Sequence, residues 1–439
     1  MQSSGKSQTD TNSTTHEHVA CPACGLLCDD LTVSRNAAGM LEVSPNTCAR
    51  SVQFFQRPLT NTSPRISGKS STLQEAIAKG AEILRHANQP LIAGLGTEVQ
   101  GMRAVMQLAD CTGATLDHMN SYSGLRNTLV VQNSGWMVTT LTEVRNRVDL
   151  LLVIGTDIVS YNPRFFERTI WNSETMFDQD TSKREVVYLG GRGLDTSHGI
   201  SPAGVKPTVL ECDIEQLPEV TAALRALTAG KQLQTDSVAG IPVAELAKLA
   251  ERLHAAKYSV VSWISSAFDF PHAELTVQNI TETVIKLNEK TRSSGLPLGG
   301  SEGDYSVNQT STWISGYPVR NSLQRGYPEY DPWQFDAARM LDKGEADALL
   351  WISSFQPEKT PPASAAPTIV IGHGAMQFEH EPDVFIPVGT PGLDHAGTMF
   401  RIDSSVTLPL AALRTSPLPS LAEVIDAIET ATKLDQETC

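Results

Sequence analysis

The stretch PLIAGLGTEVQGMRAVMQLADCTG, residues 90–113, contains one complete unit of the fold that this chain is expected to adopt. It begins with a short apolar run that ends at glycine, and an amphipathic segment follows directly. The apolar run is typical of a buried strand, and the 3.6-residue periodicity behind it is typical of a helix. Strand, glycine turn and helix in alternation predict an α/β fold with largely parallel strands.

The same order of elements recurs along the chain. Further apolar runs that predict strands occupy residues 148–156, 184–192, 207–213, 258–265, 346–355, 367–374 and 383–389. Helical patterns occupy residues 72–87, 217–230 and 243–256. Because the apolar runs are continuous rather than alternating, we expect these strands to be covered by helices on both faces. No internal period is visible, which excludes solenoid and propeller folds.

The length, the net charge and the distribution of apolar residues argue against several classes of protein. The chain has 439 residues, with 34 basic and 49 acidic side chains and a net charge of −15. This length predicts several domains, and the acidic balance argues against unspecific nucleic-acid binding. No apolar run is long enough to span a membrane, and the polar first twenty residues lack the apolar centre of a signal peptide. We therefore expect a soluble, cytoplasmic protein with a flexible tail at residues 1–18, in which His16 and His18 are solvated.

Four of the seven cysteines gather near the N-terminus. They are Cys21, Cys24, Cys28 and Cys48, in the segments CPACGLLCDD and NTCAR. Three thiolates on one glycine-containing loop can hold three corners of a 4Fe–4S cluster, and the fourth can close the site. Zinc and a metal-free set of buried cysteines are the alternatives. The remaining cysteines are scattered, so the seven make a poor disulfide framework.

Polar, mostly glycine-rich segments follow several predicted strands. They cover residues 155–164, 189–199, 211–216, 298–309, 353–359 and 389–398. In open α/β sheets, ligands bind beyond the carboxyl ends of the strands, where these segments lie. Such loops are also needed merely to turn the chain, so the segments alone favour a structural role over ligand binding. None has the Gly-Lys-Ser/Thr pattern of a phosphate loop. Asp29 and Asp30 are expected to cap the segment that follows the cysteine loop.

Motifs spread over residues 19–430 resemble the B subunit of formylmethanofuran dehydrogenase, a branch of the molybdopterin oxidoreductase superfamily. CPACGLLCDDL resembles the cysteine motif of that family, NTCAR its fourth-ligand segment, VIGTDIVSYNPRFFER its pterin-side loop, and IPVGTPGLDHAGTMFRIDS a late loop. The resemblance implies the fold of formate dehydrogenase domains 1–3. It divides the chain into a small cysteine-bearing domain at 19–66, a discontinuous α/β domain at 67–145 and 320–439, and a second α/β domain at 146–319.

The same resemblance implies a set of pterin-facing positions. They are Gly155, Asn162, Arg164, Asp213, Gly299, Gly300, Gly392 and Arg401. In redox-active relatives a cysteine or selenocysteine followed by histidine ligates tungsten or molybdenum. The corresponding stretch here, DHMNSYSG at 117–124, carries Tyr122 and Ser123 at those places. A phenol there is expected to crowd the metal, so we expect no catalytic residue, vestigial pterin loops, and no molybdopterin or tungstopterin.

This pattern is similar to the B subunit of the formyltransferase/hydrolase complex of aerobic bacteria that oxidise one-carbon compounds. That complex moves a formyl group from tetrahydromethanopterin to a methanofuran-type carrier and hydrolyses it to formate. The resemblance implies a redox-inactive scaffold from an oxidoreductase family, with an amidohydrolase-like A subunit, a formyltransferase D subunit and a C subunit as partners. The alternatives are an active B subunit of a tungsten or molybdenum formylmethanofuran dehydrogenase, and an unrelated zinc-stapled α/β protein that binds a cofactor.

Overall fold

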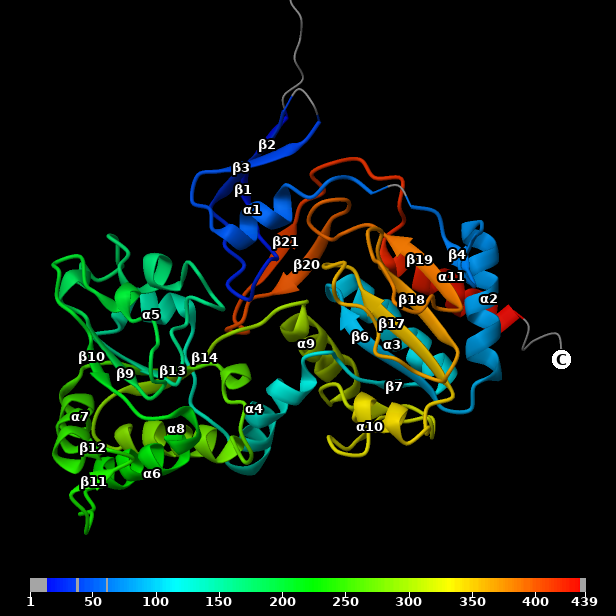
Figure 1. The fold of residues 1–439 in the computed structure, drawn as a ribbon. Helices are drawn as coiled ribbons and strands as arrows, with labels where there is room; N and C mark the ends of the chain where they lie inside the picture. Colours follow the sequence, from blue (N-terminus) through cyan, green and yellow to red (C-terminus); the bar gives the residue numbers. More distant parts are fainter. Residues whose placement is uncertain (1–13, 37–38, 61, 435–439) are drawn as a thin grey trace, which may run out of the picture.

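The computed structural model describes residues 14–36, 39–60 and 62–434, and Figure 1 shows them as three parts. A small N-terminal module carries the cysteine loop. One α/β domain contains a nine-stranded sheet, and the other contains a five-stranded sheet. Residues 1–13 of the predicted tail, and Cys439, lie outside the described residues.

The nine-stranded sheet is built from two stretches that lie far apart in the sequence. Its order is β16-β15-β7-β6-β17-β18-β19-β4-β5, and the five strands from β7 to β19 in this order are parallel. The strands are β4 (Arg65–Ile66), β5 (Lys69–Ser70), β6 (Pro90–Gly96), β7 (Thr115–Leu116), β15 (Asn321–Ser322), β16 (Glu329–Tyr330), β17 (Ala348–Ser353), β18 (Thr368–His373) and β19 (Val384–Val388). The chain therefore leaves this sheet after β7 and returns to it at β15.

Both faces of the nine-stranded sheet are buried. Ile92 and Leu350 belong to the apolar cluster on one face, whereas Leu91 and Leu349 belong to the cluster on the other. This two-sided burial explains why the strand runs are continuously apolar. The helices of this domain are α2 (Leu73–His86), α3 (Val99–Thr112), α10 (Ala337–Asp342) and α11 (Leu421–Leu434), and α11 packs against α2 and α3.

The five-stranded sheet is parallel throughout, in the order β10-β9-β8-β13-β14. Its strands are β8 (Leu150–Ile154), β9 (Glu185–Leu189), β10 (Thr208–Leu210), β13 (Ser259–Trp263) and β14 (Ser293–Pro297). The helices around it are α4 (Ser121–Ser134), α5 (Leu141–Arg147), α6 (Leu217–Thr228), α7 (Val243–Ala255) and α8 (Glu274–Leu287), and a small hairpin joins β11 (Ser237–Val238) to β12 (Ile241–Pro242). α9 (Asp304–Ser315) then leads the chain back to the larger domain, between the two sheets in Figure 1.

The N-terminal module is a three-stranded antiparallel sheet with one short helix. Its elements are β1 (Thr15–Val19), β2 (Leu31–Arg35), β3 (Leu41–Ser44) and α1 (Ala49–Phe55). The predicted tail is therefore wrong at its C-terminal end, because His16 pairs with Val33 in the β1–β2 ladder. Val19 and Leu31 share an apolar cluster with Met399 of β20 (Gly397–Phe400) and Leu410 of β21 (Thr407–Leu410), so this late hairpin covers the module.

Gly25, in the cysteine loop, joins all three parts through its backbone. Its N–H donates to the carbonyl oxygen of Gly300 at 3.1 Å, and its own carbonyl oxygen accepts from the N–H of Ile402 at 2.9 Å. A Cβ atom on this residue would lie 2.6 Å from the carbonyl oxygen of Gly299 and 3.1 Å from Cβ of Ile402. Only glycine lets these three backbones approach so closely.

Gly25→Ala is expected to lower the free energy of unfolding by about 2 kcal/mol, because the added methyl group must push two backbones apart. Chemical denaturation of the purified chain measures this change. Gly124→Ala is the matched control: its Cβ would have no neighbour within 4 Å, and alanine is the better helix former, so stability should stay equal or rise by up to about 1 kcal/mol. Equal stability of the two variants would contradict the proposed role of Gly25.

Candidate functional site

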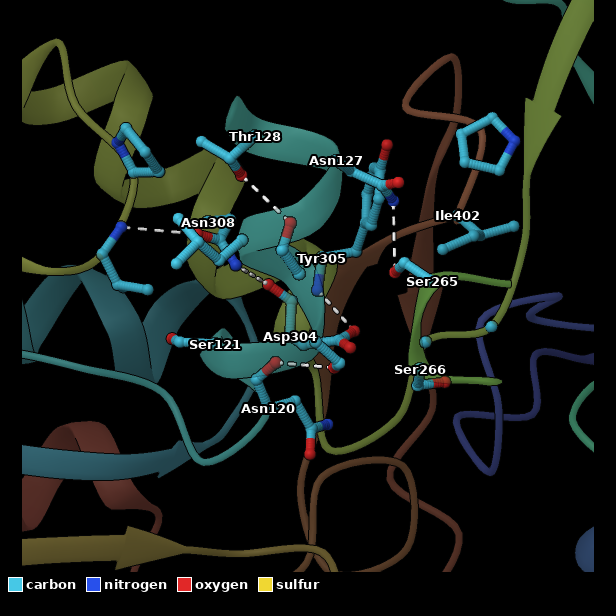
Figure 2. Close-up of a pocket in the computed structure, with 18 of the residues that line it drawn as sticks. Asn120, Ser121, Asn127, Thr128, Ser265, Ser266, Asp304, Tyr305, Asn308 and Ile402 are labelled. Carbon is cyan, nitrogen blue, oxygen red and sulfur yellow. Dashed lines mark hydrogen bonds between the residues drawn. The ribbon is translucent and has the colours of Figure 1, made fainter. Parts of the chain in front are cut away.

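A cavity of about 630 Å³ lies between the two α/β domains. Its wall combines one side of α4 and of α9, the 3-10 helix Ser265–Ala267, the loop after β14 and residues beside β15 and β16. Figure 2 shows labelled side chains around it: Asn120 just before α4, Ser121 at its start, Ser265 and Ser266 from the short helix, and Asp304 from α9. The cavity is lined mainly by amides, hydroxyls and aromatic rings.

The segment between β7 and α4 is held beside the cavity by a buried carboxylate. β7 ends at Leu116, and the residues that follow it lead into α4. Asp117 is buried and receives hydrogen bonds from the Ala337 N–H at 2.9 Å and from Nε of Arg320 at 3.3 Å. Since Arg320 itself lines the cavity, this buried ion pair fixes one wall of it.

His118 and Asn120 tie the start of α4 to the loop after β14. Nδ1 of His118 accepts from the Asn120 N–H at 2.9 Å, so its Nε2 carries the proton that is donated to the carbonyl oxygen of Glu302 at 3.2 Å. Burial lowers the pKa of His118 to about 4, which keeps the imidazole neutral. The side-chain amide of Asn120 donates to the hydroxyl and the carbonyl of Ser301, at 3.0 and 3.2 Å.

The loop after β14 is shaped by residues in the left-handed region and held by one buried amide. Gly299 and Gly300 have φ angles of +112° and +79°. Asn162, fully buried, donates to the carbonyl of Gly299 at 3.0 Å and accepts from its N–H at 2.9 Å. This reciprocal pair connects the loop after β8 with the loop after β14.

Two acidic groups lie at the end of this loop: Glu302 is buried, and Asp304, the first residue of α9, is half-buried. Burial raises the pKa of Asp304 to about 6, against hydrogen bonds from backbone N–H groups that lower it. Burial also raises the pKa of Glu302 to about 7, against the opposing charges of Lys359 and Arg57. Glu302 is 3% exposed, and its Oε2 has no hydrogen-bond partner among the described residues. The loop therefore holds two carboxyl groups that favour their protonated form more than free carboxyls do.

The four N-terminal cysteines form a second, smaller site. Cys21, Cys24, Cys28 and Cys48 line one cavity together with Arg50, which also lines the large cavity. Burial raises the pKa of Cys21 and Cys24, and raises that of Cys28 to about 12. These three thiols therefore stay protonated at neutral pH unless a metal displaces their protons.

This donor set fits an iron–sulfur cluster or zinc in its chemistry. The cavity that these cysteines line with neighbouring residues has a volume of about 10 Å³, the room of about one water molecule. No group of three or more His, Cys, Asp or Glu side chains within residues 14–36, 39–60 and 62–434 is arranged to hold a metal ion.

Comparison with known proteins points to one family. No protein-family model matches the chain. The B subunits of the tungsten-containing formylmethanofuran dehydrogenases 2 of Methanocaldococcus jannaschii and Methanococcus maripaludis are 27% and 25% identical to it, over 88% of this chain and 91% of each relative. The B subunit of the formyltransferase/hydrolase complex Fhc of Methylorubrum extorquens is 28% identical, over 76% of this chain and 87% of the relative.

A solved structure agrees with the sequence comparison. The crystal structure of the Methylorubrum extorquens formyltransferase/hydrolase complex with methylofuran contains a chain that matches with a TM-score of 0.72 and 26% identity, over 86% of this chain and 100% of that one. The chain is a homologue of these B subunits. Acetylene hydratase from Pelobacter acetylenicus, at a TM-score of 0.67 and 11% identity over 96% of this chain and 70% of that one, shares the fold. The predicted family resemblance and the molybdopterin-oxidoreductase-like α/β fold are confirmed.

The B-subunit homologue departs from the expected role of Tyr122. The wall of the large cavity includes Ser121 and Ser123 but not Tyr122, which is 65% exposed and whose ring centre lies 5.0 Å from the guanidinium of Arg126. α4 begins at Ser121, and each residue turns the next side chain by about 100°, which carries the phenol away from the cavity. The expected crowding of a metal by this ring is therefore wrong, and two hydroxyls occupy the wall instead.

The expected pterin-facing residues divide into three groups. Gly299 and Gly300 line the large cavity, and Asn162 holds them in place. The other five make structural contacts, and those of Arg164 and Gly392 reach the N-terminal module. Arg164 pairs with Asp30 and Glu167, Asp213 with Arg192, and Arg401 with Asp403, while Gly155 and Gly392 have positive φ angles in tight turns against Leu217 and Pro22.

The sequence predicted that Asp29 and Asp30 cap the segment after the cysteine loop, and this prediction is wrong. Arg168 donates to Asp29 at 2.7 Å, and Arg164 donates to both carboxylate oxygens of Asp30 at 2.7 Å. The two arginines belong to the five-stranded domain, so the carboxylates bind the N-terminal module to that domain. The partners are more than 130 residues away in the sequence, which is why local reasoning missed them.

Sequence reasoning also missed Asn120, Asp304 and Glu302. The polar segment 298–309 contained the last two, and the stretch 117–124 contained the first. The sequence did not show that these two segments lie together, joined by the hydrogen bonds of His118 and Asn120.

No helix among the described residues has both the length and the apolar character needed to cross a bilayer.

Glu302→Gln tests the electrostatics of the loop. The raised pKa means that the folded state binds the proton more tightly than the unfolded state, so wild-type stability is lost as pH rises from about 4.5 to about 7. Relative to the variant, which cannot titrate there, the wild type should lose on the order of 2–3 kcal/mol across this window. Chemical denaturation at pH values on either side of the window measures the difference.

Glu251→Gln is the control, because it removes an exposed carboxylate on α7 that is not among the charges acting on Glu302. It should keep the wild-type pH dependence. A constant stability difference between wild type and Glu302→Gln across the window would show that Glu302 does not carry the effect.

Proposed function

We propose that this homologue is the redox-inactive B subunit of a formyltransferase/hydrolase complex. In this role it serves tetrahydromethanopterin-dependent oxidation of formaldehyde to formate and holds the hydrolase subunit. Identities of 27% and 28% do not separate the dehydrogenase relatives from the formyltransferase/hydrolase relative. We therefore choose between these two kinds of B subunit from the chemistry of the cavity wall.

The observation that carries the proposal is the donor set around the large cavity. None of the described residues that line it is a cysteine or a histidine. Where α4 begins, the wall offers the side-chain amide of Asn120 and the hydroxyls of Ser121 and Ser123. Tungsten and molybdenum sites of the redox relatives use a thiolate or selenolate at this place, and soft ligands of that kind are lacking in this wall.

The scaffold role is supported by how the domains are joined. Backbone hydrogen bonds of Gly25 join the three parts around the cysteine loop, and the Arg164–Asp30 ion pair joins the N-terminal module to the five-stranded domain. These contacts join the three parts through the chain's own residues. The homologue from Methylorubrum extorquens was crystallised inside a complex of several subunits, which supports the same setting for this chain.

Purification of the assembled complex tests the redox-inactive role. Elemental analysis should find no stoichiometric tungsten or molybdenum, while the complex still releases formate from formylated carrier. Ser123→Ala should change the rate of formate release less than about twofold, since the hydroxyl has no role in that chemistry. Stoichiometric tungsten or molybdenum, or a loss of about a hundredfold or more in Ser123→Ala, would contradict the redox-inactive role and favour an active dehydrogenase subunit.

For the cysteine site we propose a 4Fe–4S cluster that acts as a structural staple between the cysteine loop and α1. Protein purified without oxygen should then contain iron and sulfide and show the visible absorbance of such a cluster. Cys24→Ala should abolish this absorbance. Cys212→Ala removes a buried cysteine that does not line the site and should keep it. Colourless protein with one zinc per chain would favour the zinc alternative, and metal-free protein would contradict both.

A further inference from the structure

A cluster of charged and polar side chains lies beyond the carboxyl ends of β17 and β18, outside the large cavity. Glu302 does not line that cavity, and its carboxyl group interacts through charge with Arg57 and Lys359. Arg57 donates to the carbonyl oxygen of Phe355, just after β17, and its charge also acts on His373, the last residue of β18. We call Glu302, Arg57, Lys359 and His373 the Glu302 cluster. Ligands of open α/β sheets bind at such an edge.

The Glu302 cluster contains hydrogen-bond donors that lack an acceptor. His373 is buried, and its Nδ1 accepts from the Ala375 N–H at 3.1 Å, so its Nε2 carries the proton. Within the described part of the chain, this Nε2–H has no acceptor. The guanidinium of Arg57 has five N–H donors but makes one hydrogen bond, to Phe355, and no ion pair with a described residue. The cluster therefore lacks an acceptor group.

The protonation of Glu302 decides whether an anion can enter. Its side chain is almost fully buried, and its Oε2 has no partner among the described residues. Burial raises the pKa of Glu302 to about 7, against the charges of Lys359 and Arg57, and the charges of Asp304 and Glu358 raise it further. The protonated carboxyl offers an O–H donor and leaves the two cations without a buried counter-charge. The ionised carboxylate would instead repel an anion.

We infer that the Glu302 cluster binds a small monocarboxylate, formate, together with the proton of Glu302. The formate oxygens accept from the Glu302 O–H and from N–H groups of Arg57 and His373. A single negative charge suits this place, because Asp304 and Glu358 would repel the second charge of a phosphate. The inference rests on the proposed function, since formate is the product of the complex to which we assign the chain.

The proton balance follows from this arrangement. Where Glu302 is ionised in the free chain, binding of one formate ion takes up one proton from the solvent, and no other bond forms or breaks. Two further ionisable neighbours do not titrate above pH 7. His118 donates to the backbone carbonyl of Glu302, and burial lowers its pKa to about 4, whereas the pKa of Asp304 is about 6.

Calorimetric titration of the full-length, metal-free chain with formate tests this site. Saturable binding is expected, and the dissociation constant should rise about tenfold for each pH unit above about 7. Repeating the titration in buffers of different ionisation enthalpy should show uptake of about one proton per formate at about pH 8. Absence of saturable binding, or tighter binding of phosphate than of formate, would overturn the inference.

Three variants locate the binding in the Glu302 cluster. Glu302→Gln keeps a donor but cannot titrate, so it should bind formate without proton uptake and with an affinity that does not change with pH. Lys359→Gln removes an exposed cation and should weaken binding by about threefold or more. Arg192→Gln is the matched control, because it removes an exposed cation in the five-stranded domain, and it should leave the affinity unchanged.

The outcomes separate this inference from the proposed function. If Glu302→Gln keeps the wild-type pH dependence, or if Lys359→Gln and Arg192→Gln bind formate equally well, the assignment to the Glu302 cluster is overturned. Either result leaves the proposed function standing, provided that the complex releases formate without tungsten or molybdenum. Stoichiometric tungsten in the complex would contradict the proposed function, whereas proton-linked formate binding that Glu302→Gln abolishes would still support this site.

Discussion

Three backbones meet at Gly25 at distances that admit no side chain, and the arrangement of the molecule depends on this contact. The cysteine loop, the loop after β14 and the hairpin β20–β21 exchange main-chain hydrogen bonds there. Because the loop after β14 also forms a wall of the large cavity, the position of that wall is set from the N-terminal module. The ion pairs of Asp29 with Arg168 and of Asp30 with Arg164 also connect the N-terminal module to the five-stranded domain.

The sequence predicted those elements whose burial is two-sided or whose ends carry clear capping residues. β6, β8, β13, β17, β18 and β19 lie within the predicted apolar runs, and α2 begins after Thr72, whose hydroxyl accepts from the Glu75 N–H as a capping box requires. β14 was missed because its sequence, Ser293–Pro297, has no apolar run. It needs a small residue there, since a Cβ on Gly295 would touch the ring of Trp263 at 3.0 Å.

The site was less predictable than the fold, for a physical reason. α4 has a weak apolar stripe. Its buried residues include both Arg126, which donates to the Ser265 carbonyl, and Leu125, which lines the large cavity. Its role at the cavity depends on hydrogen bonds to residues about 180 positions away, from Asn120 to Ser301 and from His118 to Glu302. Motifs located both segments, but only the folded chain shows that they face each other. The same holds for the orientation of Tyr122, which the helix turns out of the wall.

The split of the nine-stranded sheet has a consequence for how the chain matures on the ribosome. The strands of the five-stranded sheet are contiguous in synthesis and can pair as soon as residue 297 has emerged from the exit tunnel. The nine-stranded sheet forms later, because β6 pairs with β17 and because α11, which packs against α2 and α3, follows both of them in the sequence. Until β15 and β17 have been synthesised, the early strands β7 and β6 each have an open edge. Chaperones that bind nascent chains can protect such edges from aggregation.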